Sequence, residues 1–303
     1  MPIVVGWVNT AILSAAIMGV VNIIDSHLLS KRMPGLWTFL LPVGIIHLIY
    51  AAVLFTLFPL SEGVGTWPVL VAVASGILRT AAVIILLGSL RREEVSRVIP
   101  VVYTYPVFVA IMAVPLLGES LSYLEWLAIL IVVAGAVIVS VSQSPSGSIR
   151  WGGRLLLLFS ASLLFAAADI ASKYALGYIS FWNMFWITAF CMSGTFLLVS
   201  VRPHIIKQLS NMKQRNSALG LLVFNEILSL IGIVLSFWAL ERGPVSLVST
   251  ITSSRPMFVL IYAIVLSRLL PMFLEWRSGK GLLALRLIAT AMIVGGIGII
   301  HLV

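Results

Sequence analysis

The chain consists of long apolar runs separated by short polar connections. Ten runs of about 19 to 27 residues are each long enough to cross a hydrocarbon layer roughly 30 Å thick as a helix. The connections are too short to fold as separate domains. The pattern predicts an all-α integral membrane protein with ten transmembrane helices, over residues 3–29, 36–58, 67–90, 98–117, 124–142, 155–177, 181–201, 218–240, 247–266 and 282–303.

The fourth and ninth runs share a sequence. VSRVIPVVYTYPVFV, from Val95 to Val109, reappears 150 residues later as VSLVSTITSSRPMFV, from Val245 to Val259, with identical residues at six aligned positions. Five runs per half is an odd number, so the second half enters the membrane from the opposite side. The sequence predicts two inverted five-helix repeats, residues 1–147 and 148–303, within one compact membrane domain.

Composition supports this class and argues against several others. The chain is 61% hydrophobic and 10% charged, with a mean hydropathy of +1.14, which no soluble globular chain approaches. Its single cysteine, Cys191, cannot form an intrachain disulfide. The sequence has no metal-ligand spacing, no cofactor motif and no catalytic constellation such as HExxH. We therefore expect neither a metal, nor a cofactor, nor an enzyme.

The net charge of +9 is explained by topology. The loops after odd-numbered runs carry Lys31, Arg32, Arg91, Arg92, Arg97, Arg150, Arg154, Arg202, Lys207, Lys213, Arg215, Arg268, Arg277, Lys280 and Arg286. The opposite face carries Arg242, with four glutamates. The positive-inside rule then predicts a multi-pass protein of the cell (inner) membrane with cytoplasmic basic loops and both termini outside. Because the basic residues are scattered over five short loops, no nucleic-acid partner is expected.

With the loop residues set aside, three acidic and three basic residues remain inside the predicted spans. A charged side chain costs on the order of 3 kcal/mol or more at the bilayer centre, so each should face the bundle interior and find a partner. Helical rise places Arg79, Glu226 and Arg255 at a common depth near the midplane. Asp25 lies close enough to the basic end to reach interfacial water. The six are Asp25, Arg79, Asp169, Lys173, Glu226 and Arg255.

Both halves resemble a known family. The segment GSLRREEVSRVIPVVYTYPVFVAIMAVPLLGESLSYLEWLAILIVVAGAVIV and the second copy, WALERGPVSLVSTITSSRPMFVLIYAIVL, are similar to EamA-type repeats of the drug/metabolite transporter superfamily. The resemblance implies ten helices in two inverted repeats, a central cavity and alternating access. It also implies export of amino acids or metabolites, or exchange of sugar nucleotides and phosphorylated compounds. One departure is the LGE at Leu117 to Glu119, which has no clear counterpart after the ninth run.

Pro106 and Pro256 lie well inside the fourth and ninth spans, and we expect each to bend its helix and expose backbone groups. Hydroxyl and guanidinium donors precede both prolines, either as cavity lining or as ordinary interhelical hydrogen bonds. Tyr105 and Arg255 occupy the same aligned position, and we expect this difference to determine substrate choice. The donors are Tyr103, Tyr105, Ser254 and Arg255.

Arg255 is the sharpest substrate-binding candidate, because a guanidinium stays protonated and fits a carboxylate or phosphate. The alternative is a permanent ion pair with Glu226, which is itself the best candidate for proton coupling. Arg79 could complete a site with two positive groups and one negative group. A weaker alignment of the two halves pairs Asn22 with Asp169 and adds both to the candidate site.

Three further features favour structural roles. Asp169 and Lys173 are spaced i to i+4 and should neutralise each other along one helix face. His47 stands alone on an apolar span, which is more typical of a hydrogen-bonded helix contact than of a proton relay. Gly135 and Gly296, in the last helix of each half, indicate close helix packing or a dimer face.

The sequence as a whole predicts a secondary transporter, an exporter or exchanger of a small anionic or zwitterionic metabolite such as an amino acid. The expected partners are the substrate, the lipid bilayer, and protons or a counter-substrate, with the protein a monomer or homodimer. The alternatives are a flippase for a lipid-linked carrier and a membrane assembly subunit that transports nothing. A lateral opening between helices would favour a lipid, and an enclosed polar cavity a metabolite.

Overall fold

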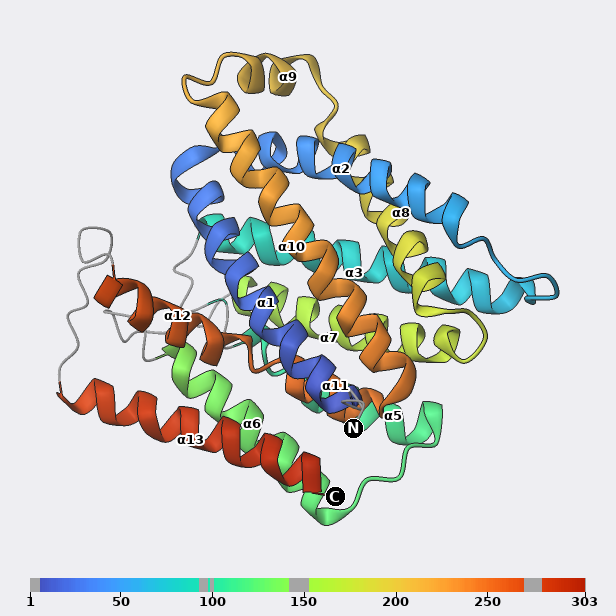
Figure 1. Cartoon of the computed structure of the whole chain (residues 1–303), viewed down its shortest axis with the longest axis vertical. Helices are drawn as coiled ribbons and strands as arrows, with labels where there is room; N and C mark the ends of the chain where they lie inside the picture. The colour runs from blue at the N-terminus through green and yellow to red at the C-terminus, as the bar shows by residue number, and fades with distance from the viewer. Residues whose placement is uncertain (1–5, 93–97, 99–100, 142–152, 270–279, 303) are drawn as a thin grey trace, which may run out of the picture.

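The computed structural model describes residues 6–92, 98, 101–141, 153–269 and 280–302. Over these residues the protein is helical and contains no β-strand (Figure 1). Helices follow from the sequence because an apolar segment in lipid must satisfy its backbone groups internally. In chain order the elements are α1 (Trp7–His27), the π-helical turn η1 (Leu28–Arg32), α2 (Leu36–Leu57), α3 (Thr66–Arg92), α5 (Tyr105–Leu117), α6 (Tyr123–Val141), α7 (Gly153–Leu176), α8 (Phe181–Ser200), α9 (Pro203–Ser210), α10 (Arg215–Arg242), α11 (Val245–Thr252), α12 (Arg255–Leu269) and α13 (Lys280–Leu302).

The helices lie close to the predicted apolar runs. Within the described residues, eight helical segments are long and apolar enough to cross a membrane. Two shorter apolar helices, Tyr105–Leu117 and Tyr123–Val139, lie where the fourth and fifth runs are predicted. The all-helical membrane class is therefore confirmed, and the count of ten spans stays a prediction.

The packing of the helices relates the two halves to each other. α1 packs along α10 as α7 packs along α3, while α2 packs on α8 and α6 on α13. Exchanging each helix for its counterpart in the other half, α1 for α7 and α3 for α10, reproduces the same set of contacts. This arrangement fits the predicted inverted repeats. The predicted boundary at residue 147 falls outside the described residues and stays a prediction.

The prolines predicted to bend helices lie at breaks between helices. In the first break, the N–H of Thr104 donates to the carbonyl of Val101, and the N–H of Val107 donates to the carbonyl of Thr104. The second break repeats this pattern with Ser254, Ile251 and Met257. The N···O distances are 3.3 and 3.1 Å around Thr104, and 3.0 and 2.9 Å around Ser254. Pro106 and Pro256 thus occupy the first turn of a new helix, where a missing N–H is tolerated.

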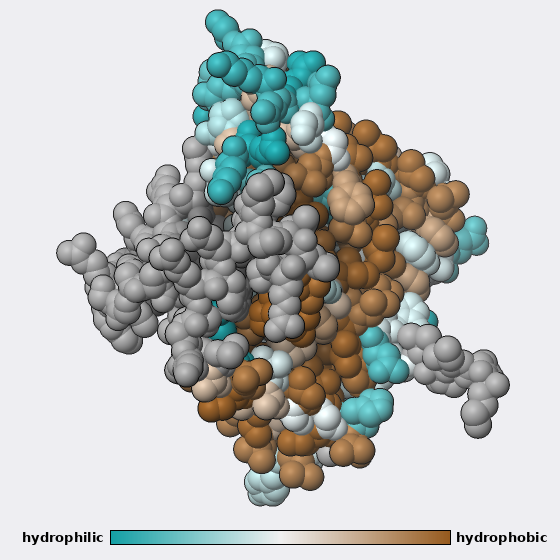
Figure 2. Space-filling view, turned by 60° about the vertical axis from the view of Figure 1, so that its left-hand side comes forward, coloured by the Kyte–Doolittle hydropathy of each residue, from teal (hydrophilic) through white to brown (hydrophobic). Residues whose placement is uncertain are grey.

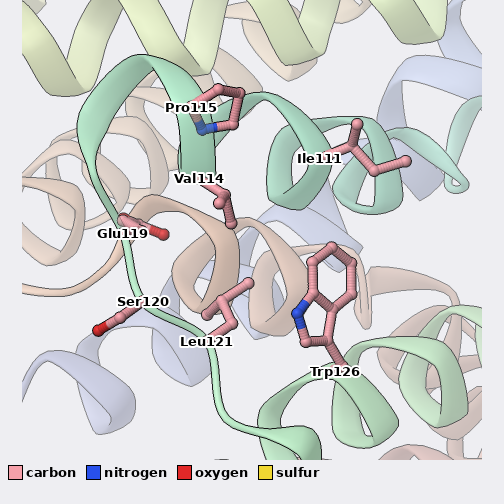
Figure 3. A pocket seen from close by; sticks show the side chains of 7 residues that line it. All are labelled: Ile111, Val114, Pro115, Glu119, Ser120, Leu121 and Trp126. Carbon is pink, nitrogen blue, oxygen red and sulfur yellow. The ribbon is translucent and has the colours of Figure 1, made fainter.

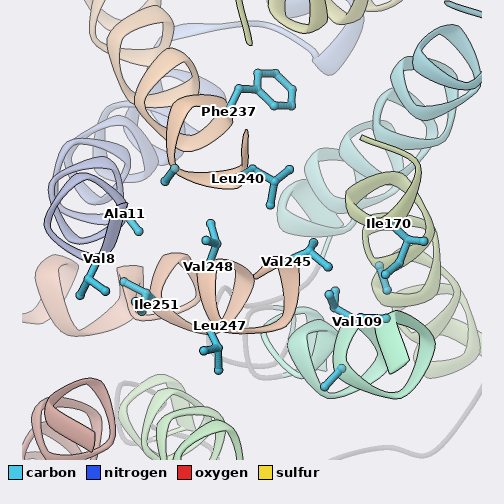
Figure 4. Close-up of a cluster of buried hydrophobic side chains, with 14 of the residues drawn as sticks. Val8, Ala11, Val109, Ile170, Phe237, Leu240, Val245, Leu247, Val248 and Ile251 are labelled. Atoms are coloured by element: carbon cyan, nitrogen blue, oxygen red, sulfur yellow. The ribbon is translucent and has the colours of Figure 1, made fainter. Parts of the chain in front are cut away.

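The short helix α11 lies at the centre of the larger apolar core, and all eight of its residues are buried. Figure 4 shows Val245, Val248 and Ile251 of α11 among side chains of α1, α5, α7 and α10. α11 also carries serine and threonine hydroxyls. The fold therefore places polar groups of the second half deep inside the bundle, next to helices of the first half.

The outer surface is largely apolar. Hydrophilic residues gather at the end of the molecule that carries α9, and hydrophobic residues cover much of the remaining visible face (Figure 2). The start of α1 and the end of α13 both lie toward the end of the molecule away from α9 (Figure 1). This fits the prediction that the termini share one side of the membrane. Which side that is remains a prediction.

Close packing between α6 and α13 depends on two glycines. A Cβ on Gly296 would lie 2.5 Å from Cγ2 of Val132 and 3.1 Å from the carbonyl oxygen of Ala128. A Cβ on Gly135 would lie 2.8 Å from the carbonyl oxygen of Ala289. The predicted close packing is therefore present, and it occurs between the two halves of one chain.

These contacts predict a large difference between adjacent glycines. Gly296→Ala should lower the free energy of unfolding by about 1–3 kcal/mol, because α6 and α13 must separate to admit the methyl group. Gly295→Ala should be neutral or slightly stabilising, since a Cβ there meets nothing within 4 Å. Thermal unfolding of both variants in the same detergent checks this. Equal midpoints would contradict the assigned packing.

Candidate functional site

The centre of the site is an ion pair between the two halves. Nη2 of Arg79, on α3, donates to Oδ1 of Asp169, on α7, at 2.6 Å. The other oxygen of Asp169 accepts a hydrogen bond from the hydroxyl of Ser249, on α11, at 2.7 Å. The Arg79 guanidinium also lies over the ring of Phe237, on α10, 5.4 Å from its centroid. With side-chain exposures of 22% for Arg79 and 10% for Asp169, this pair is largely shielded from solvent.

Tyr105 extends the cluster from the first break in the helices. Its hydroxyl contacts the carbonyl oxygen of Ser249 at 3.3 Å and the hydroxyl of Thr252 at 3.2 Å. The guanidinium groups of Arg79 and Arg255 both lie near enough to interact electrostatically with this hydroxyl. One tyrosine therefore links the two arginines.

Arg255 belongs to the same cluster and lies near both Tyr103 and Tyr105. It is the first residue of α12, and its side chain lies beside the Tyr103 hydroxyl. That hydroxyl accepts a hydrogen bond from the Asn22 amide at 3.1 Å. Arg255 forms no ion pair with any residue that the structure describes, and its Nε is buried without a hydrogen-bond partner. The Nε of Arg79 is unpartnered in the same way.

The repeat explains how these side chains meet. Tyr105 and Arg255 are the first residues of α5 and α12, at aligned positions in the two halves. Asn22 on α1 and Asp169 on α7, which the weaker alignment pairs, lie beside Tyr103 and Tyr105 respectively. Each break places a helix C-terminus beside a helix N-terminus, whose partial charges oppose each other, so the positive potential of the site comes from the two arginines. The arrangement suits a ligand with a negative group.

The structure brings together six of the residues selected from the sequence and separates two. Arg79, Arg255, Tyr103, Tyr105, Asn22 and Asp169 share one cluster. Ser254 points away from it, because its fully buried hydroxyl donates to the carbonyl of Ile251. Glu226 pairs with His47 at 3.0 Å, which contradicts the alternative of a permanent ion pair between Arg255 and Glu226. His47 thus makes a hydrogen-bonded contact between α2 and α10.

The predicted local pair between Asp169 and Lys173 is also wrong. Asp169 pairs with Arg79, whereas Nζ of Lys173 donates to the carbonyl oxygens of Leu240, Glu241 and Gly243 at 2.8, 3.3 and 2.8 Å. These carbonyls end α10, where a cation is favoured by the helix dipole. The i to i+4 spacing allowed Asp169 and Lys173 to make contact, but each instead bonds to groups on neighbouring helices.

Two residues of the cluster, Ser249 and Phe237, were not predicted from the sequence. Ser249 holds Asp169, and Phe237 lies under Arg79. A signal for Ser249 exists: it is a serine aligned with Ile99 of the first half, at a buried position of an otherwise matching segment. Phe237 gives no such signal among the other apolar residues of α10.

Comparison with protein families supports the architecture. The model of the EamA-like transporter family matches the chain twice, at residues 5–141 and 153–301, and so covers nearly all of it. The chain belongs to the EamA-like transporter family. It is therefore a membrane transporter of the drug/metabolite type, and the two-fold match fits the repeats described above.

Structural comparison of this EamA-like transporter agrees with its fold. A crystal structure described only as that of a protein aligns at a TM-score of 0.64 and 18% identity, covering 98% of this chain and 94% of its own. At this identity the likeness shows the fold alone. No curated protein matches the chain.

A cross-repeat contact joins the end of α5 to the start of α11 in this EamA-like bundle. The carboxylate of Glu119, in the LGE after α5, accepts hydrogen bonds from the N–H groups of Val245 and Ser246 and from the Ser246 hydroxyl. It thereby caps the N-terminus of α11, while Lys173 caps the end of α10 just before it. The Glu119 carboxylate and the Lys173 ammonium group therefore both stabilise the α10–α11 turn.

A surface hollow of about 600 Å³ lies beside this turn (Figure 3). It is mostly apolar, and none of the central arginines, tyrosines or Asp169 lines it. Glu119 is its charged residue, and that carboxylate is bound to α11. The hollow is therefore separate from the candidate site of this EamA-like transporter. Its lining consists of Ile111, Val114, Pro115, Glu119, Ser120, Leu121 and Trp126.

Proposed function

We propose that this EamA-like protein is a secondary transporter of a small anionic or zwitterionic metabolite, such as an amino acid, acting as an exporter or exchanger. One observation carries the proposal: two arginines and one carboxylate meet in one cluster, so among the described residues one positive charge is in excess and two buried Nε groups have no partner. A buried charge without a counter-ion is costly. A substrate carboxylate or phosphate would supply the missing negative group and acceptors.

The geometry also supports alternating access as the mechanism. The cluster draws Asn22, Arg79, Tyr103 and Tyr105 from the first half and Asp169, Ser249 and Arg255 from the second. A rocking motion of one repeat against the other would change these contacts around a central substrate. The caps that Glu119 and Lys173 place on the α10–α11 turn would have to break when that end opens. Substrate binding shifts the balance between states only by its difference in affinity for them.

A ligand screen by thermal stability tests the substrate class. Amino acids, phosphorylated sugars and nucleotide sugars should be compared, with each amino acid tested beside its carboxamide. We expect an acid to raise the unfolding midpoint and its amide to do so much less, because only the acid neutralises the excess charge. A ligand present at a free concentration of 100 times its Kd stabilises the folded state by about 2.7 kcal/mol.

The screen also separates the alternatives. Stabilisation by amides equal to that by acids would contradict recognition of a negative group. A response confined to lipid-linked phosphates would favour the flippase. The burial of the charged cluster and its separation from the apolar hollow favour a compact metabolite over a lipid carrier.

A further inference from the structure

A second buried polar cluster lies on α1, α2 and α10. Nε2 of His47, on α2, lies 3.0 Å from Oε2 of Glu226, on α10. Their residues are only 3% and 5% exposed. Beside Glu226, the fully buried Asn225 donates from Nδ2 to Oδ1 of Asp25, on α1, at 2.7 Å. Asp25 therefore has a protein partner in the bundle, beyond the interfacial water expected from its position in the sequence.

This cluster has unused hydrogen-bonding capacity. Nδ1 of His47 and Oδ1 of Asn225 are both buried, and neither has a hydrogen-bond partner among the described residues. The carboxylates of Asp25 and Glu226 lie close enough to repel each other when both are charged. Neither carboxylate pairs with a lysine or arginine of the described chain. Fixed cations do not compensate the two acids, so their charge depends on bound protons.

The surroundings of the cluster contain few other ionisable groups. Tyr50, also on α2, contacts His47 ring to ring at 4.9 Å and lies near Glu226. α8, which packs against α2, presents the rings of Phe185 and Phe196. Lys31 and Arg32 of η1 are one to two turns beyond Asp25 and interact with His27. The ionisable groups that face Glu226 from the packed helices are thus Asp25, His47 and Tyr50.

We propose that Asp25, His47 and Glu226 form a proton-binding site separate from the arginine cluster, with Asn225 positioning Asp25. Two carboxylates and one imidazole become electrically neutral when they hold two protons: one makes His47 an imidazolium beside the Glu226 carboxylate, and the other neutralises Asp25. Losing a proton leaves a net negative charge in a low-dielectric site, and this favours water entry or movement of the helices. The ligand is the proton itself.

The position of this site links it to the substrate site, an implication that rests on the proposed transport function. Both bonds, His47 to Glu226 and Asn225 to Asp25, join the first half to the second. Asp25 lies three residues after Asn22, on the same face of α1, and Asn22 holds the Tyr103 hydroxyl beside Arg255. Proton release at Asp25 would therefore alter the helix that positions one side of the substrate site.

Proton binding can be measured on the full-length protein without any substrate. Infrared difference spectra after a pH jump should show a protonated-carboxyl band in the wild type at a pH where surface acids are ionised. Asp25→Asn or Glu226→Gln should remove or shift that band. A pH-indicator dye should count about one fewer proton taken up per molecule for either variant. Glu62→Gln, on an exposed loop, is the matched control and should leave both signals unchanged.

The outcomes decide the proposal independently of the transport assignment. A wild-type band that is retained in both isosteric variants, or no such band at all, would overturn the proton site. Loss of the wild-type band on adding sodium chloride, with no loss on adding choline chloride, would overturn it in favour of a sodium site. Measuring the wild type directly keeps the test valid if one variant misfolds. Failure of the ligand screen would leave these results unaffected.

Discussion

Arg255→Ala should fold and insert like the wild type and yet show no saturable transport. The removed guanidinium has no ion-pair partner among the described residues and leaves a buried Nε unpartnered, so the fold loses little without it. A bound anion would lose a charge-assisted hydrogen-bonding group, which is typically worth about 1.5–3 kcal/mol. The apparent affinity should fall by about 10- to 100-fold, so that transport no longer saturates over the concentration range that saturates the wild type.

Uptake into proteoliposomes and thermal shift, with an acid selected by the ligand screen, measure both parts of this prediction. Arg242→Ala is the matched control, because Arg242 is an exposed arginine that pairs with Glu241 at the surface and lies outside the cluster. Arg255→Lys should recover charge without the planar fork and give an intermediate affinity. Unchanged saturable transport by Arg255→Ala would exclude Arg255 from the substrate site.

The sequence predicted the all-helical membrane fold and selected six residues that the structure brings into one cluster, for identifiable reasons. Apolar length determines the spans, because the bilayer sets the length of a crossing helix. The repeated proline located both breaks. Depth along each helix placed Arg79 and Arg255 together, since helical rise converts residue number into distance.

Partner choice could not be predicted in the same way. Depth also placed Glu226 beside Arg255, yet rotation about the α10 axis directs Glu226 to His47 on α2. The spacing of Asp169 and Lys173 permitted a pair, but Arg79 and Ser249 on adjacent helices take the carboxylate. Which face of a helix meets which neighbour depends on tertiary packing. A single sequence of apolar spans carries little of that information.

Asp169→Asn should be among the most destabilising single substitutions in the chain. It removes the charge that compensates Arg79 and leaves a mostly buried guanidinium opposite a neutral amide. Breaking a buried ion pair from one side typically costs about 3–5 kcal/mol. Chemical denaturation in detergent should show this loss, and the remaining hydrogen bond to Ser249 should retain only a small part of the stability.

A second substitution separates the observed pair from the local one. Arg79→Met combined with Asp169→Asn should recover most of the lost stability, because it removes the uncompensated charge and keeps the long apolar side chain over Phe237. Lys173→Met combined with Asp169→Asn should recover nothing, since Lys173 binds carbonyls at the end of α10. Rescue by Lys173→Met instead of Arg79→Met would contradict the assigned pair. If the variant with Arg79→Met and Asp169→Asn is stable but binds no substrate, the charges of Arg79 and Asp169 are needed for ligand binding and not for folding.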